Sequence, residues 1–310
     1  MNFTHLLNFI QIVEWGNISK AATFLNIAQP ALSRQIQSLE ESLGVKLLMR
    51  YSWGVTPTAD GKILLEHAHR IEKEYQSARE LIQKNHDKPI GRAVLGVPSA
   101  YAVSLIPDLL QRMRISYPNI DIRVAEAFSG TIYEWLYSGR LDLAILYQTE
   151  DKVAAVTTDF FNEDFAFICS TDMYNDRAEI RLSEISGMKL IVPWRPHMVR
   201  LILESAFLSN AISFNPAIEI DSLPCMKELV HRGEGVTILP PSSVAREIQS
   251  GRLKAIPITS PNIKLTMMIG RPAGRSISPV IKIIIDELQK LAVDLAPSLK
   301  WECTFPTGDK

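Results

Sequence analysis

Residues 19–48 read SKAATFLNIAQPALSRQIQSLEESLGVKLL, and this stretch decides the fold of the N-terminal part of the chain. Apolar residues recur with the helical period on both sides of a turn at residues 26–28. We expect Ser19 to cap the first helix and Pro30 to open the second, because proline lacks the N–H that a first helical turn leaves unpaired. Another amphipathic helix precedes them. The pattern predicts a helix-turn-helix, with a plain three-helix bundle as the alternative.

The second helix of this pair carries hydrogen-bond donors away from its apolar face. These donors are Ser33, Arg34 and Gln37. Arginine can read guanine through two hydrogen bonds, and serine or glutamine can reach a phosphate or a base edge. The exposed donors therefore indicate contact with double-stranded DNA.

The same stretch resembles the winged helix-turn-helix of LysR-type transcriptional regulators over about sixty residues. The resemblance rests on Ser19-Lys20-Ala21-Ala22, Gln29-Pro30-Ala31-Leu32-Ser33-Arg34-Gln35-Ile36, Leu39-Glu40 and Leu43-Gly44. It implies that the third helix enters the major groove. The expected DNA-binding residues are Ser19, Gln29, Pro30, Ser33, Arg34, Gln37, Arg50 and Trp53.

The expected wing departs from the family pattern. The family reads Arg, two small residues, Arg, Gly, Val, whereas this chain reads Arg50-Tyr51-Ser52-Trp53-Gly54-Val55. A wing-tip arginine would enter the minor groove, where narrow A·T tracts attract cations. Trp53 cannot supply that charge. Two interpretations stay open: Trp53 packs on sugar or wedges at the DNA backbone, with weaker A·T-tract preference, or it packs only against the wing.

A heptad pattern follows the wing. We expect residues 59–87 to form a long linker helix with Thr58 as its N-cap. Apolar residues spaced alternately by four and three form a seam of period 3.5: Leu64, Ala68, Ile71, Tyr75, Ala78 and Ile82. A two-stranded coil, and hence a dimer, would bury this seam, while packing within its own domain is the alternative. His67 and His69 point to different faces, so we expect solvated side chains and no metal site.

Composition limits the remaining possibilities. The chain has 310 residues, with 33 Lys+Arg against 34 Asp+Glu and 46% hydrophobic residues, which excludes a disordered chain. Residues 1–58 hold four Lys+Arg against three Glu, so their net charge is only +1. We therefore expect DNA affinity from a few placed contacts. Three scattered cysteines and the lack of a long apolar run favour a cytoplasmic protein.

Strands and helices alternate over the remaining two hundred residues. The pattern predicts an α/β region of two lobes, one of residues 91–161 and 268–298 and one of residues 162–267, followed by a polar tail at 299–310. Ligands in such sheets bind outside the carboxyl ends of the strands, where helix N-termini favour anions. The expected effector-binding residues are Ser99, Ala100, Ser129, Gly130, Tyr147, His197 and Arg200, with Arg195 nearby.

The resemblance extends through this region, on Ile106-Pro107, Gly139-Arg140-Leu141-Asp142, Asp221-Ser222-Leu223 and Gly233-Glu234-Gly235-Val236. It implies the fold of periplasmic binding proteins and a transcriptional regulator. Such a regulator binds a small-molecule effector in the cleft, forms dimers and tetramers, bends DNA and contacts RNA polymerase. We expect no cofactor and no metal, and an effector that is an anion or another small metabolite. A solute-binding module and an α/β enzyme are the alternatives, and the sequence shows no nucleophile elbow and no phosphate loop.

Overall fold

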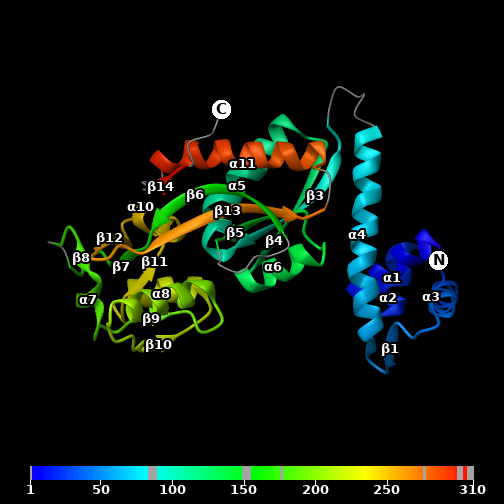
Figure 1. Ribbon diagram of the computed structural model, residues 1–310, viewed down its shortest axis with the longest axis horizontal. Helices are drawn as coiled ribbons and strands as arrows, with labels where there is room; N and C mark the ends of the chain where they lie inside the picture. The colour runs from blue at the N-terminus through cyan, green and yellow to red at the C-terminus, as the bar shows by residue number, and fades with distance from the viewer. Residues whose placement is uncertain are drawn as a thin grey trace. The chain divides into compact units, whose positions relative to one another are not determined.

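The computed structural model describes residues 2–82, 89–148, 155–174, 177–274, 277–298 and 303–305. These residues form two compact units, one of residues 2–82 and one built from most of the rest (Figure 1). No helix in the described ranges is long and apolar enough to cross a membrane.

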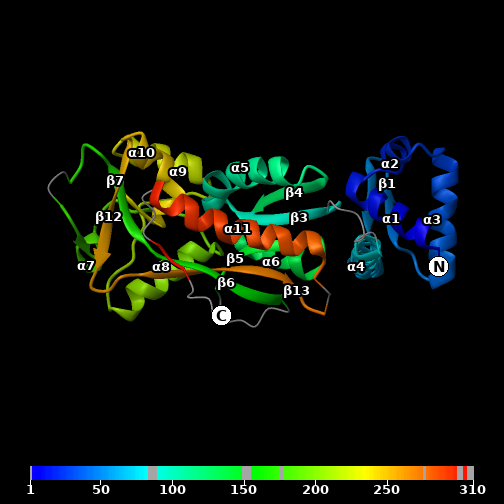
Figure 2. The same ribbon diagram turned by 90° about the horizontal axis from the view of Figure 1, so that it is seen from above.

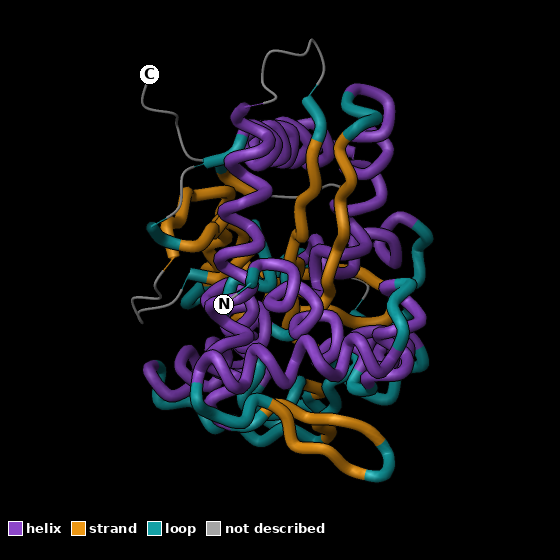
Figure 3. The backbone as a smooth tube through the Cα atoms, turned by 90° about the vertical axis from the view of Figure 1, so that its right-hand side faces the viewer, coloured by secondary structure: helices purple, strands orange, loops and turns teal. Residues whose placement is uncertain are grey.

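The N-terminal unit is a winged helix-turn-helix, as the sequence predicts. It comprises α1 (Phe3–Trp15), α2 (Ile18–Leu25), α3 (Gln29–Leu43), the hairpin of β1 (Leu48–Tyr51) and β2 (Gly54–Pro57), and the long helix α4 (Ala59–Ile82). Figure 3 shows these helices and the hairpin. The apolar faces of α1, α2 and α3 meet in one core, in which Phe9, Leu32 and Ile36 have no exposed surface.

The cap of α2 differs from the prediction. Asn17, not Ser19, is the N-cap, because its side-chain oxygen accepts from the backbone N–H groups of Ser19 (2.9 Å) and Lys20 (3.1 Å). An amide oxygen caps as well as a hydroxyl, and Asn17 precedes the first helical residue. Ser19 is thereby left exposed at the start of α2. Pro30 lies in the first turn of α3, where its missing N–H is harmless.

Two glycines allow the wing to approach the helices closely. The N–H of Val55 donates to the carbonyl of Gly16, over 2.8 Å, and a Cβ atom at Gly54 would lie 2.4 Å from that same carbonyl oxygen. A Cβ atom at Gly61 would lie 2.1 Å from the carbonyl oxygen of Leu47. Only glycine fits these two contacts. They fix the hairpin against the end of α1 and the start of α4.

The expected seam of α4 divides into two parts. Ala68 is fully buried against Leu6 and Ile10 of α1, and Leu64 packs there too, so the first part of the seam lies within its own unit. The second part is exposed: Ile71, Tyr75, Ala78 and Ile82. Thr58 caps the helix as predicted, accepting from the Gly61 N–H. The expected helix residues 83–87 lie outside the described residues.

His69 also differs from the prediction. We expected it to be solvated, but it is buried and its Nδ1 atom lies 4.0 Å from a carboxylate oxygen of Glu72. The helical turn that buries Ala68 carries its neighbour His69 inward as well. Among the described residues no group of His, Cys, Asp or Glu side chains is placed to hold a metal ion.

The larger sheet of the C-terminal unit has the strand order β14-β6-β13-β5-β3-β4. Strand β3 is parallel to β4 and β5, and the remaining pairs are antiparallel. Helices α11 and α6 lie on opposite sides of the sheet (Figure 1). The elements are β3 (Gly91–Pro98), α5 (Ser99–Ser116), β4 (Ile120–Ala127), α6 (Ser129–Tyr137), β5 (Leu143–Tyr147), β6 (Ala155–Asp164), β13 (Lys264–Pro272), α11 (Pro279–Ser298) and β14 (Cys303–Thr304).

The second lobe contains a smaller, mixed sheet with the order β11-β7-β12-β8, and a separate pair of strands, β10 and β9. Figure 2 shows β7 and β12 side by side, as their antiparallel pairing requires. The elements are β7 (Ala166–Ser170), β8 (Ile180–Arg181), α7 (Leu182–Ile185), β9 (Ile191–Val192), α8 (Met198–Ser209), β10 (Ile218–Glu219), α9 (Leu223–His231), β11 (Thr237–Leu239), the short 3₁₀ helix η2 (Pro241–Val244), α10 (Ala245–Gln249) and β12 (Leu253–Thr259).

The chain crosses between the lobes a few residues away from the predicted points. Strand β6 belongs to the larger sheet as far as Asp164, and β13 rejoins that sheet at Lys264. These two strands pair along their length, which carries the larger sheet past the predicted boundaries at 161 and 268. The prediction of a polar tail at residues 299–310 is also corrected in part. Cys303 and Thr304 form an edge strand on β6, and the Phe305 ring lies 6.5 Å from that of Phe161.

Candidate functional site: a DNA-facing helix and an interlobe pocket

Helix α3 presents a polar face outward from the N-terminal unit. Its apolar residues are locked in the core, which fixes the rotation of the helix. Gln29 Nε2 donates to Ser33 Oγ over 3.0 Å, and Gln37 Nε2 donates to Glu41 over 2.9 Å, so these side chains line one stripe. The expected DNA-binding residues are exposed, apart from the half-buried Ser33: Ser19, Gln29, Pro30, Arg34, Gln37, Arg50 and Trp53.

Glu40 joins α3 to the wing. Its buried carboxylate accepts from the backbone N–H groups of Leu47 (2.9 Å) and Leu48 (3.4 Å), and from Lys46 Nζ at 2.7 Å. Burial raises the pKa of Glu40, but the hydrogen bonds from Lys46 and the backbone outweigh this effect and lower the pKa overall. These contacts, which we call the Glu40 anchor, hold the start of the wing against α3, and the apolar periodicity of the sequence does not predict them.

The wing ends in an aromatic pair. The rings of Tyr51 and Trp53 are stacked, with centroids 4.8 Å apart and planes 6° apart. Trp53 nevertheless keeps 69% of its surface exposed. Trp53 therefore packs on its own wing through one ring face and presents the rest of its surface outward.

Cations on the N-terminal unit are few. Within residues 2–58, Lys46 is paired with Glu40, whereas Lys20, Arg34 and Arg50 are exposed and form no ion pair in this segment. Arg34 lies on α3 and Arg50 lies at the start of the wing. Within residues 2–58, three exposed cations without an ion pair in this segment thus remain.

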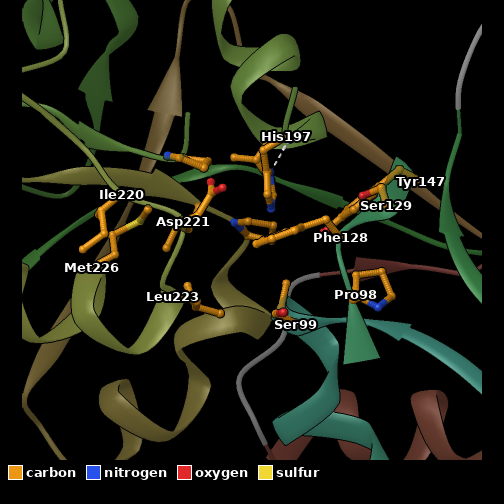
Figure 4. Close-up of a pocket in the computed structure, with 16 residues that line it drawn as sticks. Pro98, Ser99, Phe128, Ser129, Tyr147, His197, Ile220, Asp221, Leu223 and Met226 are labelled. Carbon is orange, nitrogen blue, oxygen red and sulfur yellow. Dashed lines mark hydrogen bonds between the residues drawn. The ribbon is translucent and has the colours of Figure 1, made fainter. Parts of the chain in front are cut away.

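The C-terminal unit has a pocket between its lobes (Figure 4). Lobe one contributes the ends of β3, β4 and β5 and the first residues of α5 and α6. The second lobe contributes the segment before α8 and the segment after β10. The cavity volume is about 40 Å³, or about 480 Å³ with all free space up to its open mouth. Five of the expected effector-binding residues line it: Ser99, Ala100, Ser129, Tyr147 and His197.

His197 closes one side of the pocket. Its ring meets the Phe128 ring of the other lobe edge-on, with centroids 5.3 Å apart. Nδ1 accepts from the Val199 N–H over 3.1 Å, so the neutral ring carries its proton on Nε2. Burial lowers the pKa of His197, and the Asp221 carboxylate opposes that shift only in part. The imidazole is therefore neutral near pH 7.

Arg195 and Arg200 do not line the pocket, contrary to the expectation. Arg195 donates to both carboxylate oxygens of Glu204, and Arg200 pairs with Glu204 at 2.6 Å and with Glu219 at 3.0 Å. Arg200 also lies over the Phe214 ring, at 4.8 Å. The i, i+4 spacing on α8 turns Arg200 toward Glu204, and Arg195, in the segment before α8, pairs with the same carboxylate. Gly130 is exposed and also lies outside the lining.

Most of the remaining lining is apolar, and the sequence analysis did not assign it. One acidic residue, Asp221, lies beside His197 in this wall (Figure 4). The Asp-Ser-Leu segment was recognised as a family motif but received no role. Its position directly after a strand is the sequence signal that could have identified Asp221 as a lining residue, because ligands bind beyond the carboxyl ends of strands. The unassigned lining residues are Pro98, Ala127, Phe128, Pro193, Val199, Ile220, Asp221, Leu223, Met226, Leu239 and Pro240.

A buried carboxylate, that of Glu163, connects the two lobes through hydrogen bonds. Glu163, near the end of β6, accepts from the Tyr101 hydroxyl of α5 and from Ser242 Oγ of η2, the latter over 2.8 Å. Burial and the Glu163 charge raise the pKa of both Tyr101 and Tyr147. Both phenols therefore stay protonated at neutral pH, and the Tyr101 hydroxyl donates to Glu163. Glu163 thus forms a polar contact between the two lobes, close to the point where the chain passes from one lobe to the other.

A winged helix-turn-helix joined to a two-lobed unit with an interlobe pocket defines a DNA-binding regulator that responds to a small molecule. Comparison with known proteins agrees. Residues 3–62 match the family model of the bacterial regulatory helix-turn-helix protein, lysR family, and residues 86–292 match the LysR substrate binding domain. The chain belongs to the LysR family of transcriptional regulators.

Relatives cover nearly the whole chain. The nitrogen assimilation regulatory protein nac of Escherichia coli is 30% identical, over 94% of this chain and 95% of its own length. A solved structure of a full-length OxyR variant from Pseudomonas aeruginosa matches with a TM-score of 0.78 at 23% identity, covering 94% of this chain and 99% of that one. The structure of full-length CbnR complexed with its target DNA matches with a TM-score of 0.66 at 20% identity, covering 94% and 100%. Because their identities to this chain are only 23% and 20%, these two structures support its fold and nothing further.

Proposed function

We propose that this protein binds promoter DNA as a dimer through α3 and the wing, and that a small molecule in the interlobe pocket alters the DNA complex. The observation that carries the proposal is the exposed polar stripe of α3, held by a rigid apolar core. Arg34 is the exposed cation on that stripe and can pair with guanine or phosphate. The solved CbnR complex with target DNA supports this role for the fold.

A gel-shift measurement on the protein's own upstream region tests DNA binding. Arg34→Ala should weaken binding about tenfold or more, since a good side-chain contact to a base contributes about 1–3 kcal/mol. Arg114→Ala is the matched control, because Arg114 is an exposed arginine on α5 of the other unit. Equal affinity of the Arg34→Ala variant and the wild type would contradict the proposed role of α3.

Self-association is proposed to use the exposed part of the α4 seam. Ile71 and Tyr75 are 40% and 49% exposed, and Ile82 is 79% exposed. Large apolar side chains along one helix face are typical of a surface buried in a coil with a second helix. A dimer would place two copies of α3 about one DNA turn, or a multiple of it, apart. Tetramer assembly, DNA bending and contact with RNA polymerase complete the proposed mechanism.

The pocket is proposed as the effector site. Its lining comes from both lobes, so a ligand that prefers one lobe arrangement shifts the population toward it. Ser99 and Ser129 open α5 and α6, whose first N–H groups favour a carboxylate or similar anion. Ser99→Ala or Ser129→Ala should weaken the effector response and leave basal DNA binding unchanged. Parallel loss of both activities would contradict two separate sites.

Peroxide sensing is a second candidate, because some relatives are named hydrogen peroxide-inducible genes activators. Two of the three thiols, those of Cys169 and Cys303, argue against peroxide sensing. Burial raises the pKa of Cys169 to about 11, and burial with the Glu163 charge raises that of Cys303 to about 11. A redox sensor needs a thiolate at neutral pH. If peroxide changes the footprint of wild type but not of a Cys225→Ser variant, redox sensing replaces effector binding.

A further inference from the structure

Two polar atoms of the pocket lining are buried and lack a hydrogen-bond partner. They are Ser129 Oγ, on lobe one, and Asp221 Oδ1, on lobe two. Ser129 is only 3% exposed, so its hydroxyl has no solvent to turn to. A buried polar group without a partner costs free energy, and native proteins rarely keep one without a function. A ligand that enters this pocket can satisfy both atoms.

The charge of the pocket determines what the second lobe can recognise. Among the described residues of the lining, Asp221 is the one acidic side chain, and neither lysine nor arginine occurs. His197 beside it is held neutral by burial. The nearby arginines Arg195 and Arg200 are already paired with Glu204. An unpaired carboxylate in these surroundings favours a ligand that brings a positively charged hydrogen-bond donor.

The opposite wall has the opposite preference. The N-terminal residues of α5 and α6 converge on the pocket, and the N-cap of α5 is Pro98, which offers no side-chain hydrogen bond to the free N–H groups. The buried Ser129 hydroxyl lies at the start of α6 and can donate. These groups suit a carboxylate. The space between the two walls is apolar, lined by Phe128, Leu223 and Met226 (Figure 4).

We propose that the effector is a compact zwitterion, a free α-amino acid with an apolar side chain, whose ammonium group binds Asp221 and whose carboxylate binds the start of α5 and α6. This inference rests on the proposed function of the pocket as the effector site. Because its two charged groups bind different lobes, the ligand then couples the lobes to each other.

The test is isothermal titration of the full-length protein with each standard L-amino acid. Every amino acid that binds is compared with its des-amino carboxylic acid and with its decarboxylated amine. The account expects at least one apolar amino acid to bind and both analogues to bind more than tenfold more weakly. Asp221→Asn should reduce amino-acid affinity about 30-fold or more, as expected for truncating one partner of a buried charge pair. Asp172→Asn, at an exposed aspartate of the same lobe, is the control and should bind like wild type.

Three results would overturn the inference. The first is that no amino acid binds. The second is that the des-amino acid binds as tightly as the amino acid, and the third is that the Asp221→Asn variant binds the amino acid like wild type. Circular dichroism of both variants verifies that they fold. A footprint in the presence of the des-amino acids distinguishes the claim that the pocket is the effector site from the claim that the effector is a zwitterion. If a des-amino acid changes the footprint, the pocket remains the effector site and only the zwitterion is wrong.

Discussion

The salt dependence of DNA binding is the prediction that follows most directly from the charges of the N-terminal unit. Three exposed cations without an ion pair in residues 2–58, Lys20, Arg34 and Arg50, are available to phosphates, since Lys46 is paired with Glu40. Each phosphate neutralised contributes about −0.9 to the slope of log K against log salt concentration. These cations should therefore give a slope of about −2.7 for one copy of residues 2–58 and about −5.4 for the two copies of a dimer on two sites.

Substitution in the wing tests the same reasoning. Trp53→Arg places a cation on the exposed wing tip and should steepen the slope by about 0.9 per unit, whereas Arg34→Gln should flatten it by about 0.9. Fluorescence anisotropy of a labelled operator over a series of KCl concentrations measures the slope for the wild type and each variant. Trp53→Ala is the uncharged control and should leave the slope unchanged. A wild-type slope much steeper than −6 would refute the reasoning, because it requires more phosphate contacts than these cations supply.

Three further predictions concern stability and assembly. Glu40→Ala leaves the Leu47 N–H without its acceptor and should lower the free energy of unfolding by about 3 kcal/mol, measured by urea denaturation; a loss under about 0.5 kcal/mol contradicts the anchor. Burial holds the pKa of His197 below 6.5, so the unfolded chain binds a proton that the folded chain excludes, and stability should fall as the pH drops below 6.5. His197→Gln should remove this part of the pH dependence in thermal melts, and an unchanged dependence would assign it to other groups. Tyr75→Glu should dissociate the dimer in sedimentation velocity, whereas Leu208→Glu, at an exposed site of α8, should not; a dimer that survives Tyr75→Glu places the interface elsewhere.

The sequence predicts the N-terminal unit well because its determinants are local. The helical period fixes which face of α3 is buried, and the exposed donors follow from that. The cap of α2 was assigned to Ser19 instead of Asn17 because both side chains can cap and lie two residues apart. The fate of Ala68 depends on α1, far away in the sequence, and periodicity alone cannot distinguish burial within a unit from burial in a dimer.

The pocket shows the same limit. Ser99 and Ser129 were identified because each opens a helix after a strand, a local signal. The prediction for Arg200 is wrong because its guanidinium group pairs with Glu204 and Glu219 and so does not reach the pocket. These ion pairs depend on how α8 packs, which the sequence pattern does not show. The role of Asp221 emerges only when burial and missing hydrogen-bond partners are considered together.

A footprint of the protein's upstream region tests the central claim most directly. Full-length protein is measured with and without the low-molecular-mass fraction of its host cells, beside the Arg34→Ala and Ser129→Ala variants. The account predicts a protected segment that Arg34→Ala loses, and a change in its extent or its hypersensitive positions that the fraction causes in wild type but not in Ser129→Ala. A footprint that needs no Arg34, or one that responds equally in the Ser129→Ala variant, would contradict a DNA-binding regulator controlled through this pocket.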